Sequence, residues 1–108
     1  MNTVLLLLVV VNFMKFVDSY RGISCPRKCY CYESMNSVNI RTEVIVDCSK
    51  RKLHAVPSTR MPLHVTTLAL HENYITELAP FAFDKYRYLK ELYLYKNFIL
   101  NAHKDTFR

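Results

Sequence analysis

Glycine and acidic residues are scarce in this sequence. Its 108 residues include a single glycine, and nine aspartates and glutamates stand against fifteen lysines and arginines. One glycine is too few for a loop that cradles phosphates or for the strained turn that presents a catalytic serine. We expect the carboxylates, among them Glu72 and Glu91, on an exposed surface without a cleft. The sequence therefore predicts no enzyme activity, no catalytic residue and no cofactor.

The sequence also lacks an apolar run long enough to span a membrane. Residues 4–11 are apolar without a break, and Asn12 and Lys15 interrupt the continuation to Val17. A membrane-spanning helix needs about 20 predominantly apolar residues, so we expect no transmembrane segment within this chain. The run suits the hydrophobic part of a secretory signal peptide, with a cleavage site at the end of residues 17–19. We predict a signal peptide at residues 1–19 and a secreted or extracellular location.

The cysteines are few but even in number. All of them follow the predicted cleavage site, and they are Cys25, Cys29, Cys31 and Cys48. An oxidising compartment would pair them, and the residues alone allow three connectivities. A structural zinc site usually has two close ligand pairs. The C-x3-C-x-C spacing and the scattered histidines differ from that pattern, so we expect no metal.

An internal repeat is the most informative pattern present. The motif V-x-x-L-x-L-x-x-N-x-I at residues 65–75 recurs as L-x-x-L-x-L-x-x-N-x-I at residues 89–99, and a degenerate copy begins 22 residues before the first. Leucines two apart point to one face of a strand. The repeat asparagines, Asn73 and Asn97, can bond backbone groups that a turn leaves unpaired. A chance mixture of helix and strand would not place the asparagines, isoleucines and phenylalanines in the same register.

These residues resemble the extracellular leucine-rich-repeat family, whose consensus is L-x-x-L-x-L-x-x-N-x-[LI]. The segment C-P-R-K-C-Y-C at residues 25–31, followed by Cys48, resembles the cysteine-rich amino-terminal cap found in Slit-, Toll-, Nogo-receptor- and proteoglycan-type proteins. The resemblance implies an α/β solenoid with short parallel strands and an irregular or 3-10 convex side. It also implies the bridges Cys25–Cys31 and Cys29–Cys48.

The same resemblance divides the mature chain. It implies a cap at residues 20–48 and two to three repeats at residues 49–108, the last of them incomplete and uncapped. The gap between Cys31 and Cys48 is longer than in many such caps, so we expect a flexible loop at residues 33–41. We expect the chain to be the amino-terminal part of a longer receptor or matrix protein.

The outward residues of the short strands are the predicted ligand face. The repeat register places them in three rows, which are Asp47, Ala69 and Tyr93; Ser49, His71 and Tyr95; and Ile45, Thr67 and Glu91. Tyr93 and Tyr95 are the best candidates for contact, because tyrosine is enriched at interfaces. The alternative is that they are solvated residues with high β-propensity. The leading hypothesis is a binding module that presents a concave sheet to an extracellular protein ligand.

Basic residues suggest a second surface. Lys50, Arg51 and Lys52, with Arg27 and Lys28, could bind a sulfated glycan through charge and counterion release. The alternative is a solvated turn. The net charge of +6 is moderate, and without a recognition motif we expect no nucleic acid partner. Two other functions stay open, namely a self-contained disulfide-rich factor of toxin or antimicrobial type and a glycan-binding matrix component.

Overall fold

The computed structural model describes residues 23–36 and 41–107, so the predicted signal peptide and its cleavage site lie outside the described residues. The described part contains short strands and no helix. The side opposite the main sheet consists of turns and a second pair of strands, which agrees with the irregular convex side that we expected, whereas the absence of helix from the described part differs from the α/β class. The strands are β1 (Tyr30–Asn36), β2 (Arg41–Asp47), β3 (Thr67–Ala69), β4 (Glu77–Leu78), β5 (Glu91–Tyr93) and β6 (Asn101–Ala102).

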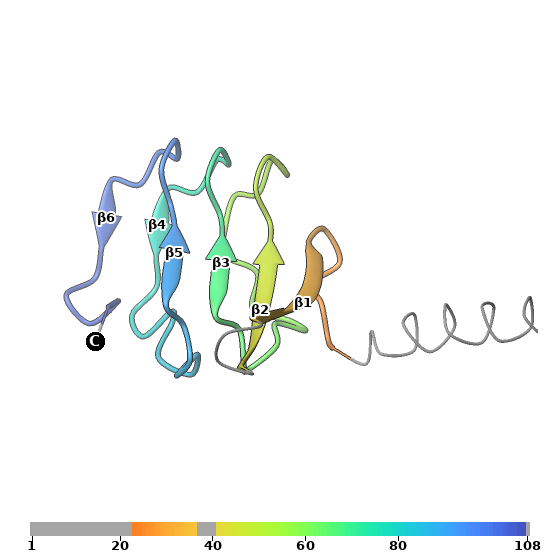
Figure 1. Ribbon diagram of the computed structural model, residues 1–108. Helices are drawn as coiled ribbons and strands as arrows, with labels where there is room; N and C mark the ends of the chain where they lie inside the picture. The colour runs from red at the N-terminus through yellow and green to blue at the C-terminus, as the bar shows by residue number, and fades with distance from the viewer. Residues whose placement is uncertain (1–22, 37–40, 108) are drawn as a thin grey trace, which may run out of the picture.

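The main sheet has the order β1-β2-β3-β5, and a smaller sheet pairs β4 with β6. Strands β2, β3 and β5 are parallel, and Val46 pairs with Leu68 and Leu68 with Leu92. These pairs are 22 and 24 residues apart, as the repeat predicts. Figure 1 shows the three strands side by side, with the chain leaving each strand at the same edge. The register of the repeat is therefore the register of the sheet.

Strand β1 was not expected. It runs antiparallel to β2, from Tyr30 opposite Asp47 to Asn36 opposite Arg41. The predicted loop at residues 33–41 is wrong for residues 33–36 and 41, and residues 37–40 lie outside the described residues. Two causes favour the strand. The run of β-branched residues in β2 suits a sheet, and its outer edge offers a ladder of backbone groups that β1 satisfies.

Two disulfides fasten β1 and the segment before it to the parallel strands. Cys25 is bonded to Cys31 and Cys29 to Cys48, with sequence separations of 6 and 19. This is the pairing that the family resemblance implied. Cys48 is fully buried directly after β2, so the second bridge joins the cysteine-rich segment to the interior of the repeats.

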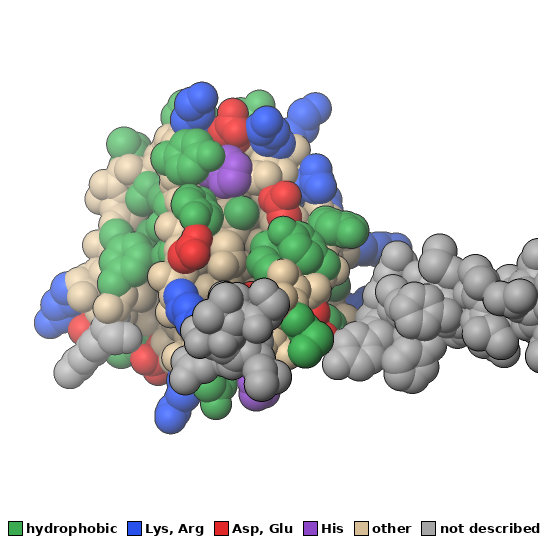
Figure 2. Space-filling view, viewed as in Figure 1, with side chains coloured by type: hydrophobic (Ala, Val, Ile, Leu, Met, Phe, Trp, Pro, Cys, Tyr) green, Lys and Arg blue, Asp and Glu red, His purple; other side chains and the backbone are tan. Residues whose placement is uncertain are grey.

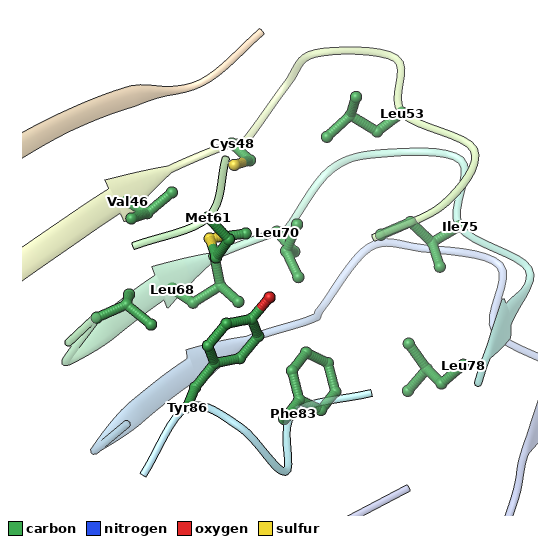
Figure 3. Packing of buried hydrophobic residues seen from close by; sticks show 11 residues of the cluster. Val46, Cys48, Leu53, Met61, Leu68, Leu70, Ile75, Leu78, Phe83 and Tyr86 are labelled. Carbon is green, nitrogen blue, oxygen red and sulfur yellow. The ribbon is translucent and has the colours of Figure 1, made fainter. Parts of the chain in front are cut away.

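The core is built from equivalent apolar positions of successive turns. Val46 and Leu68 share one position and Cys48 and Leu70 the next, and all four have no exposed surface. Figure 3 shows these side chains converging with others from the turns opposite the main sheet, which are Met61, Phe83 and Tyr86. Burying a leucine side chain stabilises a fold by about 1.5–3 kcal/mol. The shared interior is thus the main source of stability.

The turn that contains β5 is less buried. Leu92, Leu94 and Ile99 pack against the core but remain partly exposed. Further along, Leu100 is 85% exposed and Phe107 62% exposed. The interior that is closed around β3 is therefore partly open beside β5.

A buried threonine locks the beginning of β3 to β2. The Thr66 side chain accepts a hydrogen bond from the Val44 amide at 2.9 Å and donates one to the Val44 carbonyl at 3.0 Å. The Thr66 amide donates to the same carbonyl at 2.8 Å. Because all of these groups are buried, losing them would leave unpaired backbone groups in the core.

Candidate ligand-binding face

Asn73 holds two successive turns together at the point where β3 ends. It is 3% exposed, and its amide group donates to the carbonyls of Cys48 and Leu70, each at 2.9 Å. Its carbonyl accepts from the backbone amides of Arg51 and Leu53, each at 3.0 Å. The side chain thus takes up backbone groups that a turn leaves without partners.

Asn97 repeats this arrangement one turn later. It donates to the carbonyls of Leu70 and Leu94 at 2.9 Å and accepts from the Ile75 amide at 3.1 Å. The two asparagines bond to the preceding turn as well as to their own. They therefore fix the spacing of the turns, and with it the positions of the outward side chains.

The predicted face residues lie together on this frame. Ile45, Thr67 and Glu91 pair in register, and so do Asp47, Ala69 and Tyr93. The row of Ser49, His71 and Tyr95 follows beyond the strand ends, where the Lys50 amide bonds the His71 carbonyl and the Glu72 amide bonds the Tyr95 carbonyl. We call these three rows the sheet face. Ala69 is 8% exposed, so it forms the floor of its row rather than a contact residue.

Sequence reasoning missed two aromatic residues of this face. Tyr30 pairs with Asp47 and Tyr32 with Ile45, and directly opposite residues of an antiparallel pair lie on the same side of a sheet. The two rings are 59% and 44% exposed, with centroids 5.5 Å apart. They were missed because no strand was predicted at residues 30–36. The period-two alternation of Tyr30 and Tyr32 is the signal that could have indicated them.

The other end of the sheet face is an ordered aromatic cluster. The His71 ring stacks on Tyr95 with centroids 4.5 Å apart, and it meets Tyr93 edge-on at 6.1 Å. Tyr93 is 39% exposed and Tyr95 53% exposed. The rings are thus held by each other while a large part of their surface remains accessible.

Two carboxylates carry the charge of the face. Asp47 accepts hydrogen bonds from the Ser49 amide at 2.9 Å and the Ser49 hydroxyl at 2.6 Å. Burial raises the pKa of Asp47, but the bonds from Ser49, with the electrostatic effect of Arg51 and of the neighbouring His71 side chain, lower it more, so the pKa lies below its ordinary value. Asp47 is therefore ionised at neutral pH.

Glu91 accepts a hydrogen bond from the Tyr93 hydroxyl. That bond and the charge of Glu91 raise the pKa of Tyr93 above its ordinary value, which keeps the phenol protonated. The three rows contain no lysine or arginine. In Figure 2 acidic and hydrophobic side chains occupy the middle of the view, and most of the lysines and arginines lie toward its margins. The sheet face of this basic protein is therefore acidic.

The predicted basic patch lies along the edge where the parallel strands end. The Arg51 guanidinium donates to the Lys28 carbonyl at 2.9 Å, which places the two segments of the patch next to each other. Lys50 lies 3.7 Å from Glu72, and Lys96 lies 3.8 Å from the same carboxylate. Sequence reasoning missed Lys96, although Lys50, Glu72 and Lys96 occupy the same position of successive turns.

Two hollows lie away from these surfaces. One, of about 480 Å³, is lined by residues of the turns opposite the main sheet, including Val56, Glu77 and Lys85. The other, of about 590 Å³, lies near the start of the parallel strands and includes His64 and Tyr88. Within residues 23–36 and 41–107 there is no group of three or more His, Cys, Asp or Glu side chains that could hold a metal ion. The same stretch has no helix of the length and apolarity that crossing a membrane requires.

No family model matches the sequence. The chain is 32% identical over 90 residues to leucine-rich repeat-containing protein 3 of Danio rerio, an alignment that covers 83% of this chain and 31% of that protein. The chain thus spans about a third of the length of this relative. Over most of its length it is similar to a leucine-rich-repeat protein, and its two disulfides fit the amino-terminal cap of such a protein.

Proposed function

We propose that this chain is the capped amino-terminal part of an extracellular leucine-rich-repeat solenoid, and that it binds a protein ligand on the sheet face. The similarity to a leucine-rich-repeat protein supports an interaction module. The two disulfides are compatible with an extracellular location. We propose a binding module and no catalytic step.

The observation that carries the proposal is the ordered aromatic cluster of His71, Tyr93 and Tyr95. Binding costs free energy for each side chain that must be immobilised, about 0.5–1.5 kcal/mol for a flexible one. Here the rings already stack on a frame fixed by Asn73 and Asn97, so that cost is reduced. Tyrosine is also enriched among the residues that dominate binding energy.

Charge points to the kind of partner. The face offers Asp47 near its centre and Glu91 beside the aromatic cluster, without a lysine or arginine in the three rows. A lysine or arginine of the partner could pair with these carboxylates and lie over a tyrosine ring. Complementary charge of this kind raises the rate of association and selects the partner. We propose a ligand that presents a basic segment.

The area that a stable interface requires supports including β1 in the proposed binding surface. A stable interface covers about 800 Å² on each partner, and three rows on three short strands are a small platform. Tyr30 and Tyr32 extend two of the rows onto a fourth strand. The proposed interface therefore has tyrosines at both ends and Asp47 between them.

The test is selection of peptides from a displayed random library against the full chain with both disulfides formed. We expect the selected peptides to be rich in lysine and arginine and to lose at least tenfold in affinity for Tyr93→Ala, because truncating an anchor residue costs 2 kcal/mol or more. Tyr88→Ala is the matched control, since Tyr88 is 59% exposed and lies outside the three rows. Equal affinity for the wild type and for Tyr93→Ala would refute the sheet face as the binding surface.

A further inference from the structure

The turns repeat an unusual backbone conformation at the edge where β2, β3 and β5 end. Lys50, Glu72 and Lys96 occupy equivalent positions of three successive turns, and their φ angles are 54°, 58° and 54°. Left-handed φ values are uncommon outside glycine, so the recurrence reflects a turn geometry that each repeat imposes. Its consequence is a row of three long charged side chains across the ends of the strands.

Within that row the positive charge exceeds the negative. The carboxylate of Glu72 lies 3.7 Å from the Lys50 ammonium and 3.8 Å from the Lys96 ammonium. The lysine side chains are 69% and 72% exposed. Exposed pairs of this kind contribute little stability. The two lysine ammonium groups share the single carboxylate of Glu72. An incoming anion can therefore replace that carboxylate beside either lysine at a small cost in free energy.

The row continues toward the disulfide-bonded segment. Arg51 and Lys28 are adjacent through the hydrogen bond between the guanidinium and the backbone, and Lys52 is exposed in a turn with φ 57°. We call this surface the basic edge. It comprises six exposed cations, which are Arg27, Lys28, Lys50, Arg51, Lys52 and Lys96. Glu72 lies among them and Asp47 faces Arg51, and Figure 2 shows the edge as lysine and arginine side chains around one acidic side chain.

We propose that the basic edge binds a linear sulfated polysaccharide. Adjacent strands are about 4.8 Å apart, so Lys50 and Lys96, two strands apart, are separated by roughly 10 Å along the edge. A single small anion would meet one or two exposed ammonium groups. A linear polyanion can instead contact the whole row and release counterions at each contact. The disulfides indicate an oxidising compartment, where sulfated polysaccharide is a suitable polyanion.

This surface adjoins the sheet face, because Lys50 and Glu72 directly follow Ser49 and His71, but the two surfaces carry opposite charge. The sheet face carries Asp47 and Glu91 and would repel a sulfated chain, whereas the basic edge attracts one. The two proposals can therefore fail independently. Tyr93→Ala should leave polysaccharide binding unchanged.

Substitution of Glu72 gives the sharpest test, because the proposal predicts that removing this carboxylate increases the affinity for the polysaccharide. The probe is immobilised heparin, and the measurement is the sodium chloride concentration that elutes the full chain. Lys96→Ala should elute earlier and reduce the slope of log affinity against log salt by roughly one. Glu72→Gln should elute later than the wild type, since it frees both lysines from their shared carboxylate.

Matched control variants distinguish the effect of a residue's position on heparin binding from the effect of the protein's net charge. Lys85→Ala and Glu77→Gln change the charge by the same amounts, and both residues line the hollow away from the edge. We expect these two controls to shift elution much less than Lys96→Ala and Glu72→Gln do. Circular dichroism of each variant verifies that its fold is intact.

Four outcomes would overturn the proposal. The first is that the full chain passes through the heparin column at low salt, and the second is that the edge variants and their controls shift the eluting salt concentration equally. The third is that the full chain is retained as strongly on fully desulfated heparin as on heparin. The fourth is that it binds phosphatidylserine vesicles more tightly than heparin. The last would assign the edge to a membrane surface.

Discussion

The turn that contains β3 and the turn that contains β5 have the same sequence pattern but different surroundings. Leu68 and Leu70 are fully buried, whereas their equivalents Leu92 and Leu94 are partly exposed. Strand β3 lies between β2 and β5 in the main sheet, and β5 is at its edge. A repeat motif therefore specifies which side chains point inward, while the neighbouring turns determine how deeply they are buried.

The same difference holds for the polar groups. Asn73 is buried and bonds backbone groups of its own turn and of the turn before it. Asn97 bonds the same kinds of groups but is less buried. Equal residues at equal repeat positions should therefore differ in their contribution to stability. Paired substitutions in the two turns measure that difference.

The largest effect is expected for the core leucines. Leu70→Ala should lower the free energy of unfolding by about 3–5 kcal/mol, because it leaves a cavity in a fully packed site. Leu94→Ala should cost about half as much, since Leu94 is already partly exposed. Urea unfolding of both variants, followed by circular dichroism, measures the two losses. Equal losses would mean that the β5 turn is as well packed as the β3 turn.

A smaller difference is expected for the asparagines. Asn73→Ala should cost about 2–3 kcal/mol, because it leaves buried backbone groups without partners. Asn97→Ala should cost about 1–2 kcal/mol, because water can reach part of its site. The same urea experiment applies, with Asn101→Ala as the control at an exposed asparagine. A larger loss for Asn97 than for Asn73 would contradict the comparison.

Much of the fold could be predicted because one short motif determines it. The period of two in L-x-L gives the inward direction, and the 22- and 24-residue spacings give the strand register that Val46, Leu68 and Leu92 adopt. The rows of the sheet face follow from the same spacings. The disulfide pairing did not follow from the residues, since the four cysteines allow three connectivities. It came from the family resemblance.

Most of the misses have one physical origin, which is pairing between segments. The long gap between Cys31 and Cys48 indicated a loop at residues 33–41, but the open edge of β2 made a strand favourable at residues 33–36. Tyr30 and Tyr32 were left out of the sheet face because no strand was predicted at their positions. Thr66 was missed because a threonine in sequence does not reveal that it will exchange hydrogen bonds with Val44, 22 residues earlier. Lys96 was missed because basic residues were grouped by sequence neighbours and not by repeat position.

The smallest predicted effect concerns acid, and it distinguishes the β2 end of the sheet face from the β5 end. The pKa of Asp47 is below its ordinary value of 3.8 when the protein is folded. A lowered pKa adds stability above the unfolded pKa, and that stability is lost as the pH falls through the folded value. Between about pH 5 and pH 2 the wild type should therefore lose more stability than Asp47→Asn. The loss should be modest because Asp47 is partly exposed.

Asp84→Asn, at an exposed site, is the control and should follow the wild type. If the stability of the wild type and of Asp47→Asn changed in parallel with pH, the bonds from Ser49 would not stabilise the ionised carboxylate.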